Sequence, residues 1–322
     1  MSSQSRAEAP IPVTEDNFIR AETDMYFGAR AKATGTGKLF HFREVMPIEN
    51  QSVIRANRDT LYSSGVFDLE AAPVTITLPD PGKRFMSLMV IDEDQYIVKT
   101  VYAPGTFTFS KAETRYVLFG IRTFIDPNDP KDIERVHALQ DAIKVEQRSA
   151  GSFVAPNWDS ESRNKIRNEL IKRGASLPDT KGMFGRRGKV DSERHLIGTA
   201  TAWGGNAEED ATYLPVVPAK NDGKTVHRLT VKDVPVDGFW SISVYGADGY
   251  FHQNDRNSYS INNVTAKKDA DGSVTIQFGG CDATASNCIP ITKGWNYWVR
   301  LYRPRKEILD GSYRFPEAQP LN

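Results

Sequence analysis

Two short stretches of this 322-residue chain concentrate side chains that can move protons or bind anions. The first, residues 41–63, sets charged and amide groups among apolar ones, and such groups are costly to bury unless they pair or face a cleft. A carboxylate, imidazole or phenol there can exchange protons, and a guanidinium can bind an anionic group. The catalytic candidates are Asp59, His41 and Tyr62, and the substrate-binding candidates are Arg43, Asn57 and Arg58.

The second stretch, residues 203–213, combines aromatic rings and an amide with two adjacent glycines. Gly204 and Gly205 allow a close approach of the backbone to a ligand, and the rings can line an apolar pocket. The substrate-binding candidates here are Trp203, Asn206 and Tyr213.

Both stretches also have a purely structural interpretation. In the first, Arg43 or Arg58 can pair with Asp59, while Asn57 caps backbone groups, in an ion-pair network that only holds loops. In the second, Trp203 can end a helix, and the turn after it can pack between two lobes. The sequence leaves both interpretations open.

Familiar catalytic and cofactor motifs do not occur in the chain. It has no G-x-S-x-G nucleophile motif, and its five histidines form neither H-x-H nor H-E-x-x-H. Residues 35–38, Gly-Thr-Gly-Lys, lack the earlier glycine and the following Ser/Thr of a phosphate-binding loop. We therefore expect no fixed metal ion and no nucleotide cofactor.

The overall composition is that of a folded globular protein, with 39% hydrophobic and 25% charged residues. Lys+Arg and Asp+Glu balance at 41 each, so no net field favours nucleic acid or an anionic membrane. No segment approaches the ~20 apolar residues of a membrane-spanning helix, and the first residues lack the apolar core of a secretory signal. The default expectation is a cytoplasmic location, with a periplasmic or secreted mature form also compatible.

Only two cysteines occur, Cys281 and Cys288. They cannot supply the four ligands of a structural zinc site, and no histidine lies nearby to complete one. A local disulfide would fit an oxidising compartment, and two free thiols would fit a reducing one. The spacing does not decide between them, because a disulfide also requires a specific geometry.

Apolar periodicity and turn residues predict a mainly β chain with a helical insert, that is, an α+β protein. Residues 1–13 form a flexible tail, and residues 14–129 form an N-terminal β domain with a leading helix capped by Thr14. Residues 130–213 form a helical linking segment, and residues 214–322 form a C-terminal β-sandwich. We expect two β-sandwich or jelly-roll lobes bridged by helices. The helices of the insert are expected to begin at Pro130, at Asp159 or Ser160, and at Asp191 or Ser192.

The two β regions repeat one pattern of residues. Residues 85–96 align with residues 239–250 at a constant offset of 154. Residues 116–122 align with residues 297–303 at an offset of 181, so the second copy holds 27 extra residues around the cysteine loop. Shared polar positions in one register indicate a duplication. These positions are Ser87 with Ser241, Asp94 with Asp248, Tyr96 with Tyr250, Tyr116 with Tyr297, and Arg122 with Arg303.

Several segments resemble two families of domains of unknown function, DUF1254 and DUF1214. The resemblance to DUF1254 lies in residues 57–63, 67–69 and 84–96, and that to DUF1214 lies in residues 238–250, 259–262, 300–304 and 309–312. The resemblance covers most of the chain and implies a two-domain, β-sandwich-rich protein, often bacterial and able to form a homo-oligomer. It transfers no catalytic residue and no reaction.

Two functions fit these features. In the first, the chain binds or converts a small polar or anionic metabolite in a cleft between the lobes by general acid/base chemistry. In the second, it is a non-catalytic module that binds carbohydrate or a protein partner through exposed Trp295, Tyr297 or Trp298. The first requires the candidates of the two stretches to converge, and the second requires an open aromatic patch on a sheet.

Overall fold

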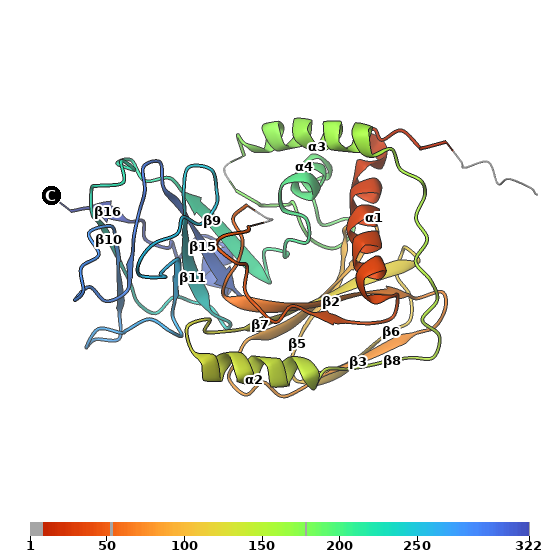
Figure 1. The fold of residues 1–322 in the computed structure, drawn as a ribbon, viewed down its shortest axis with the longest axis horizontal. Coiled ribbons are helices and arrows are strands. Elements are labelled where there is room, and N and C mark those ends of the chain that lie inside the picture. Colours follow the sequence, from red (N-terminus) through yellow and green to blue (C-terminus); the bar gives the residue numbers. More distant parts are fainter. Residues whose placement is uncertain (1–8, 52–53, 178, 322) are drawn as a thin grey trace, which may run out of the picture.

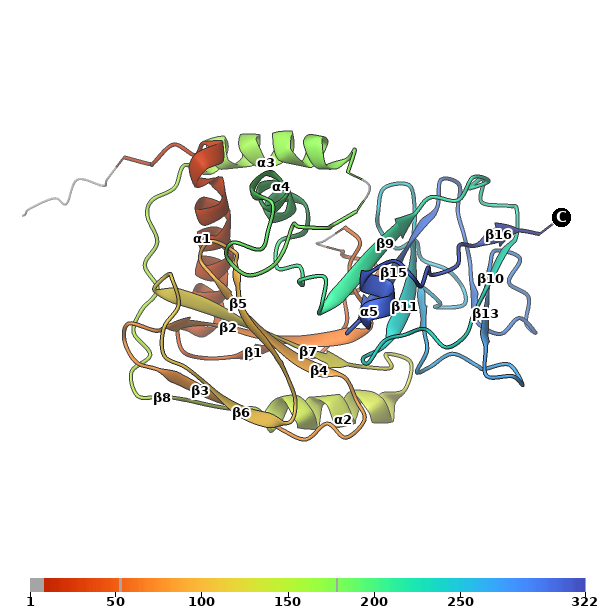
Figure 2. The same cartoon turned by 180° about the vertical axis from the view of Figure 1, so that it is seen from behind.

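The structure, a computed structural model, describes residues 9–51, 54–177 and 179–321, so most of the expected tail lies outside the described residues. Figures 1 and 2 show two lobes side by side. The N-terminal lobe carries the long helices, and the C-terminal lobe consists almost entirely of strands. The mainly β fold with a helical part confirms the fold class predicted from the sequence.

The N-terminal lobe packs two antiparallel sheets face to face. Alternate residues of their strands point into the space between the sheets, where Val74, Ile76 and Phe119 are fully buried. Each such side chain contributes about 1.5–3 kcal/mol by leaving water. The five-stranded sheet consists of β1 (Phe40–His41), β2 (Thr60–Asp68), β7 (Tyr116–Phe124), β4 (Met86–Asp92) and β5 (Ile97–Tyr102), in that order. The three-stranded sheet consists of β6 (Gly105–Phe109), β3 (Val74–Leu78) and β8 (Lys144–Gln147).

Helices cover the other face of the five-stranded sheet (Figure 1). Their apolar sides form one core with sheet residues such as Val66 and Met89. The helices on this face are α1 (Glu15–Thr34), α3 (Ser160–Gly174) and α4 (Ser192–Ala202), while α2 (Pro130–Asp141) lies on the opposite side of β2 and β7. As predicted, α2 begins at Pro130, and of the alternatives left open for α3 and α4 the caps are Asp159 and Asp191. The N-cap of α2 is Asp129, which was not predicted; in all three helices the aspartate carboxylate accepts a backbone N–H of the first turn.

The C-terminal lobe is a second sandwich, with two four-stranded sheets. Its core contains side chains of both sheets, among them Ile242, Ile276 and Val299. One sheet consists of β12 (Ser260–Asn262), β11 (Trp240–Tyr245), β15 (Asn296–Tyr302) and β9 (Ala211–Val216), in that order. The other consists of β14 (Cys288–Ile289), β13 (Val274–Phe278), β10 (His227–Val231) and β16 (Gln319–Pro320). A short helix, α5 (Lys306–Leu309), follows β15.

The two lobes have the same strand order. The order β2-β7-β4-β5 of the first lobe corresponds to β9-β15-β11-β12 of the second, and β6-β3-β8 corresponds to β13-β10-β16. Strand β14 is additional and lies in the extra segment of the second copy. The duplication predicted from the sequence therefore extends to the topology.

The strand register corrects one half of the predicted alignment. Ser87 pairs with Arg122, and Ser241 pairs with Arg300. Arg300 rather than Arg303 is thus the counterpart of Arg122, at an offset of 178 residues (300 minus 122) instead of 181. For the same reason the counterpart of Tyr297 is Phe119 and not Tyr116. The apolar residues of β7 and β15 can be aligned in more than one frame from the sequence alone. The pairing of each strand with its neighbour shows which residues of β7 and β15 are equivalent.

Residues 130–213, the expected helical linking segment, contain strand β8 and the first residues of strand β9. Strand β8 pairs with β3 and adds Val145 to the N-terminal core, and β9 joins the C-terminal sheet. Four residues are too few for a period of two to stand out in the sequence, so β8 was not predicted.

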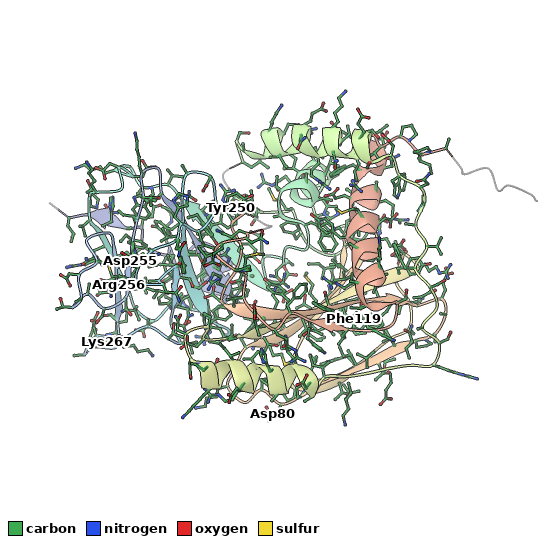
Figure 3. The ribbon with its side chains drawn as sticks, viewed as in Figure 1. Asp80, Phe119, Tyr250, Asp255, Arg256 and Lys267 are labelled. Carbon is green, nitrogen blue, oxygen red and sulfur yellow. A yellow bond between two sulfur atoms is a disulfide. The ribbon has the colours of Figure 1, made fainter. Side chains whose placement is uncertain are left out.

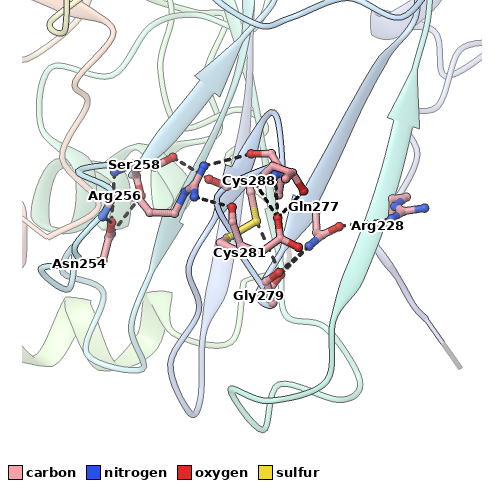
Figure 4. Close-up of a disulfide and its surroundings, with 12 residues drawn as sticks. Arg228, Asn254, Arg256, Ser258, Gln277, Gly279, Cys281 and Cys288 are labelled. Atoms are coloured by element: carbon pink, nitrogen blue, oxygen red, sulfur yellow. Dashed lines mark hydrogen bonds between the residues drawn. A yellow bond between two sulfur atoms is a disulfide. The ribbon is translucent and has the colours of Figure 1, made fainter.

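Cys281 and Cys288 form a disulfide, with their Cα atoms 5.7 Å apart. The bond closes the loop that connects β13 to β14 (Figure 4). Of the two alternatives left open by the sequence, the structure has the disulfide.

The aromatic side chains expected on an open sheet face lie mostly in the interior. Trp295 and Tyr297 are 0% exposed, so the prediction that they are exposed is wrong. Alternation along β15 turns Tyr297 into the sandwich core and Trp298 to the other face. Trp298 is half-buried there, with the Arg55 guanidinium 5.3 Å from its ring centre.

Candidate functional site

Three adjacent strands of the N-terminal lobe align a tyrosine, an arginine and a serine. Tyr62 of β2 pairs with Arg122 of β7, and Arg122 pairs with Ser87 of β4. Paired residues project from the same face of a sheet, so these side chains form a row. Arg122 is only 9% exposed, Ser87 is buried and Tyr62 is half-buried.

The C-terminal lobe repeats this row. Tyr213 of β9 pairs with Arg300 of β15, and Arg300 pairs with Ser241 of β11. Tyr62 and Tyr213, which come from the two separate candidate stretches, are therefore counterparts in the duplicated fold.

An asparagine from the segment that precedes each row contacts the tyrosine of that row. Asn57 Nδ2 lies 3.3 Å from the Tyr62 hydroxyl and 3.2 Å from the Tyr302 hydroxyl, which belongs to the other lobe. Asn206 Nδ2 donates to the Tyr213 hydroxyl at 2.7 Å. The two candidate stretches thus supply equivalent asparagine–tyrosine pairs.

The Arg122 guanidinium joins the two stretches. It donates to Asn206 Oδ1 at 3.2 Å and to the Gly204 carbonyl at 2.9 Å, and it lies 5.4 Å from the centre of the Tyr62 ring. The groups that act on its charge are tyrosine hydroxyls, and within the described ranges it forms no ion pair with a carboxylate. We call the residues gathered here the junction cluster: Asn57, Tyr62, Arg122, Asn206, Tyr213 and Tyr302.

The junction cluster shifts the pKa values of two tyrosines in opposite directions. Burial raises the pKa of the Tyr62 hydroxyl, but the positive charge of Arg122 and the hydrogen bond from Asn57 outweigh burial, so its pKa lies below the usual value. Burial, followed by the neighbouring Tyr213, holds the pKa of Tyr302 well above the usual value. Of these two hydroxyls, Tyr62 loses its proton more readily.

The arginine of the second row is sealed. Arg300 is 3% exposed and donates to Ser243 Oγ at 2.9 Å, to the Tyr245 hydroxyl at 2.7 Å and to the Arg55 carbonyl at 2.8 Å. These contacts fasten the segment before β2 onto the C-terminal sheet. The counterpart of Arg122 therefore joins the lobes and has no free side for a ligand.

Asp59, a catalytic candidate, lies beside this sealed arginine. It is 1% exposed, its Oδ1 accepts a long hydrogen bond of 3.4 Å from Asn262, and its Oδ2 has no hydrogen-bond partner among the described residues. Burial raises the pKa of its carboxyl, and nearby groups, including the positive charge of Arg300, offset this only in part. The structure places Asp59 away from solvent and outside the junction cluster.

Two further candidates lie on the other side of the sheet. His41 pairs with Ser63 across β1 and β2, and its Nδ1 lies 2.7 Å from Ser63 Oγ. Ser63 and Tyr62 are neighbours in a strand and point to opposite faces, so His41 faces away from the junction cluster. Arg43 forms an ion pair with Asp141 of α2.

The remaining candidates also have other partners. Arg58 donates to the Met46 carbonyl and lies 5.4 Å from the ring centre of Tyr259. Trp203 stacks on Tyr26 of α1, with the ring centres 4.3 Å apart. The expected pairing of Arg43 or Arg58 with Asp59 is thus not the arrangement found. The structure brings together Asn57, Tyr62, Asn206 and Tyr213 but not Asp59, His41, Arg43, Arg58 or Trp203.

Arg122 and Tyr302 belong to the cluster but were not singled out in the sequence. A signal for Arg122 was present, because it is the one charged residue in the apolar strand Tyr116–Phe124, and a lone buried charge is costly unless it has a task. Arg300 stands out in the same way in Asn296–Tyr302. Tyr302 had no such signal, because tyrosine is common in strands.

Across residues 9–51, 54–177 and 179–321, no three His, Cys, Asp or Glu side chains are grouped so that they could hold a metal ion. No helix in these ranges is long and apolar enough to cross a membrane.

Comparison with known families gives a match in each half of the chain. Residues 36–106 match the protein family of unknown function DUF1254, and residues 217–306 match the protein family of unknown function DUF1214. Asn57 and Tyr62 lie in the first match and Tyr302 in the second, while Arg122, Asn206 and Tyr213 lie between them. No curated protein matches the chain.

Solved structures share the fold. The VPA0106 protein from Vibrio parahaemolyticus superposes with a TM-score of 0.74 at 17% identity, over 96% of this chain and 98% of that one. An uncharacterised protein from Burkholderia cenocepacia gives a TM-score of 0.52 at 12% identity, over 95% of this chain and 87% of that one. These matches extend over both lobes. At these identities they show the shared fold, whereas the two family matches identify the chain as a two-domain protein of the DUF1254 and DUF1214 families.

Proposed function

We propose that the junction cluster binds a small metabolite that carries a carboxylate or another anionic oxygen, and that Tyr62 exchanges a proton with it. The ligand would lie between the lobes, and the reaction would be general acid/base chemistry without a nucleotide cofactor. Arg122 would bind the anionic group, and Asn57, Asn206 and Tyr213 would orient the ligand by hydrogen bonds.

The observation that carries this proposal is the buried positive charge of Arg122. A guanidinium that is 9% exposed and lacks a carboxylate partner in the described part of the chain is costly to keep. Its neighbours Asn206 and Gly204 offer only neutral oxygens. An anionic ligand would supply the missing negative charge, and Tyr62 and Tyr213 are only half-buried, so part of each side chain is exposed.

The lowered pKa of Tyr62 supports a role in proton transfer. A general base works best when its pKa approaches the working pH, and the charge of Arg122 moves the Tyr62 hydroxyl in that direction. The sealed Asp59, by contrast, has no contact with solvent through which a substrate could reach it.

The test is a thermal-shift screen of small carboxylic acids and phosphate esters against four proteins. Wild type and Asp59→Asn should both be stabilised by a true ligand, whereas Arg122→Lys should lose most of that shift, because lysine cannot reproduce the two-sided hydrogen bonding of the guanidinium. Arg43→Gln is the matched control for loss of an arginine, because Arg43 is held on α2 away from the cluster.

The hit compound is then followed by NMR with Tyr62→Phe. The expected result is binding within about tenfold of wild type but no conversion or exchange of the substrate proton, because only the hydroxyl is missing. Equal shifts in wild type and Arg122→Lys for every ligand would overturn the binding site. Equal conversion by Tyr62→Phe would overturn the role of the tyrosine.

The alternative of a carbohydrate- or protein-binding module receives no support from its chosen residues. Trp295 and Tyr297 are in the core, and Trp298 is half-buried against Arg55. We therefore keep the metabolite site as the proposed function.

The disulfide gives information on the cellular compartment of the protein. A bond between Cys281 and Cys288 supports a periplasmic or secreted location over the cytoplasmic default, because cytosolic thiols are kept reduced. Alkylation of the protein from its native cells, followed by mass spectrometry, would show free thiols if the location is reducing. Homo-oligomer formation stays a prediction, which light scattering of the purified protein checks.

A further inference from the structure

A polar cavity lies on the outer face of the C-terminal lobe, between strands β10 and β13 and the additional loop of the second repeat. Its volume is about 280 Å³, near the lower end of the range of small-molecule sites. The residues that the argument uses are Arg228, Lys267, Asp269, Thr275, Gln277 and Asn287. Figure 3 shows Lys267 on the C-terminal lobe, far from Phe119 of the N-terminal sandwich.

The floor of this cavity is the solvent face of two paired strands. Arg228 of β10 stands opposite Gln277 of β13, and Thr230 stands opposite Thr275. The alternate residues of both strands lie in the apolar core, so the polar side chains all point outward. Gln277 Oε1 accepts a hydrogen bond of 3.2 Å from Arg228, which holds the guanidinium over the floor (Figure 4).

The charges at the cavity are unbalanced. In the described ranges neither Arg228 nor Lys267 forms an ion pair. The single carboxylate, Asp269, is already engaged, because its Oδ2 accepts from Thr275 Oγ1 at 2.7 Å and from Ser273 Oγ at 3.3 Å. Two cations that have no carboxylate partner therefore share the lining with one carboxylate, which leaves an excess of one positive charge among amides and hydroxyls.

The wall of the cavity is the loop closed by the disulfide. Arg256 donates to the carbonyls of Asp282 and Ala285, which holds the loop from outside (Figure 4). The Cys281–Cys288 bond joins its two ends. These restraints fix the loop before any ligand binds, which lowers the entropy cost of binding.

Asn287 links this wall to both neighbouring segments. Its Nδ2 donates to the carbonyls of Lys267 and Thr275 at 2.7 and 3.1 Å, and its Oδ1 accepts from the Lys267 backbone N–H at 2.9 Å. The backbone that carries Lys267 is therefore fixed relative to β13. In the first repeat the corresponding strands β3 and β6 also pair threonines, but no such loop crosses them.

We propose that this cavity is a binding site for a small anionic polyol, such as a sugar that carries a phosphate or a carboxylate. Arg228 and Lys267 would bind the anionic group. The N–H groups of Gln277 and Asn287 and the Thr275 hydroxyl already donate within the protein, so the remaining lone pairs of their side-chain oxygens would accept hydrogen bonds from the ligand hydroxyls. The lining contains no aromatic ring on which the apolar face of an uncharged sugar would stack. The site is separate from the junction cluster.

Calorimetry with the full-length protein tests the proposal, with a hexose 6-phosphate, a hexuronate, inorganic phosphate and an uncharged hexose as probes. At least one charged sugar should bind in the millimolar range or better, and the uncharged hexose should not. Arg228→Gln and Lys267→Gln should each weaken binding about tenfold, because each removes a charge-assisted contact. Lys268→Gln is the matched control, because Lys268 is exposed, adjacent in sequence and outside the lining.

Two further variants show whether a charged sugar binds in this cavity or at the junction cluster. The double variant Cys281→Ser/Cys288→Ser should bind several-fold more weakly, because the wall loses its closure. Arg122→Lys, which removes the anion-binding group of the junction cluster, should bind the charged sugar as wild type does. Absence of binding for both charged sugars, or equal weakening by Lys267→Gln and Lys268→Gln, would overturn the site. Binding of inorganic phosphate as tightly as the sugar phosphate would overturn the polyol part, and weakening by Arg122→Lys would assign the ligand to the junction cluster instead.

Discussion

At the scale of single residues, Arg122 and Arg300 show that the surrounding groups determine the role of a side chain. Arg122 and Arg300 occupy the same position in the duplicated sheets and are both buried. Arg300 donates its N–H groups to a tyrosine, a serine and backbone carbonyls of the other lobe, and Asp59 lies near it. Arg122 faces tyrosines and an amide and keeps an unbalanced charge, so we assign it the ligand.

A buried carboxyl on α1 gives a pH-dependent prediction. Asp24 is 3% exposed, and its Oδ1 has no hydrogen-bond partner in the described part of the chain, although Trp158 Nε1 donates to Oδ2 at 2.8 Å. Burial raises the pKa of Asp24 to about 6 from 3.8. A folded-state pKa above the unfolded one means that this group stabilises the fold below pH 3.8 and that the contribution is lost as pH rises through 6.

We therefore expect Asp24→Asn to raise the free energy of unfolding by about 2 kcal/mol at pH 8 and to leave it nearly unchanged at pH 3.5. Asparagine resembles the protonated carboxyl, can still accept from Trp158 and never ionises. Urea unfolding at the two pH values measures the difference, with the exposed Asp16→Asn in the same helix as control. A variant less stable than wild type at pH 8 would contradict the burial argument.

At the scale of elements, the attachment of the segment before β1 to β2 depends on a glycine. A Cβ on Gly65 would lie 2.2 Å from the backbone oxygen of Lys38, which cannot move without shifting that segment. On the paired strand, a Cβ on Gly120 would meet nothing closer than 3.7 Å.

Gly65→Ala should therefore lower the free energy of unfolding by about 2 kcal/mol through overpacking, whereas Gly120→Ala should change it by less than about 1 kcal/mol. Both substitutions add one methyl group to neighbouring strands of one sheet, so chemical denaturation compares them directly. If the two variants lose the same stability, the close approach of Lys38 is not the cause.

At the scale of the whole molecule, an aromatic cluster couples the lobes. Phe239 of the C-terminal lobe lies 5.3 Å from Phe85 and 4.9 Å from Phe124 of the N-terminal lobe, measured between ring centres. It also stacks on Tyr302 of the junction cluster at 4.3 Å. Such a contact between buried rings should make the two sandwiches unfold together.

Calorimetry of the wild type should show one transition, and Phe239→Ala should split it into two, because the variant removes about 3–5 kcal/mol of packing at the lobe boundary. Phe315→Ala is the control, since Phe315 packs on Trp240 inside the C-terminal sandwich. Phe315→Ala should lower the unfolding temperature but still give a single transition, because the contact between the lobes is intact. Two transitions in the wild type would show that the lobes are independent.

Much of the fold could be predicted from local pattern. Strands such as Val74–Leu78 and Tyr116–Phe124 have clear boundaries in the sequence, and α2 begins at Pro130 as predicted. The caps of α3 and α4, Asp159 and Asp191, are each one of the two residues predicted. The short strand β8 could not be found, because its four residues carry no readable period. The alignment of Arg122 failed for a related reason, since apolar strands match in several frames and only strand pairing selects one.

The candidate site was partly within reach of the sequence. Asn57, Tyr62, Asn206 and Tyr213 were named from residue type and spacing, and the structure brings these four together around Arg122. Asp59 and His41 can also exchange protons. Asp59, however, is 1% exposed, and His41 lies on the opposite face of β2. Residue type does not specify the face of a strand or the depth of a loop.

The sequence by itself determined the balance of strands and helices, the duplication and the family, because these depend on local periodicity and on repeated residues. The tertiary structure alone decided which polar groups meet, that the two cysteines are bonded, and that Trp295 and Tyr297 are core residues. These outcomes depend on contacts between residues far apart in the chain. Such contacts are fixed by how the sheets pair and how the lobes pack, and no local pattern records them.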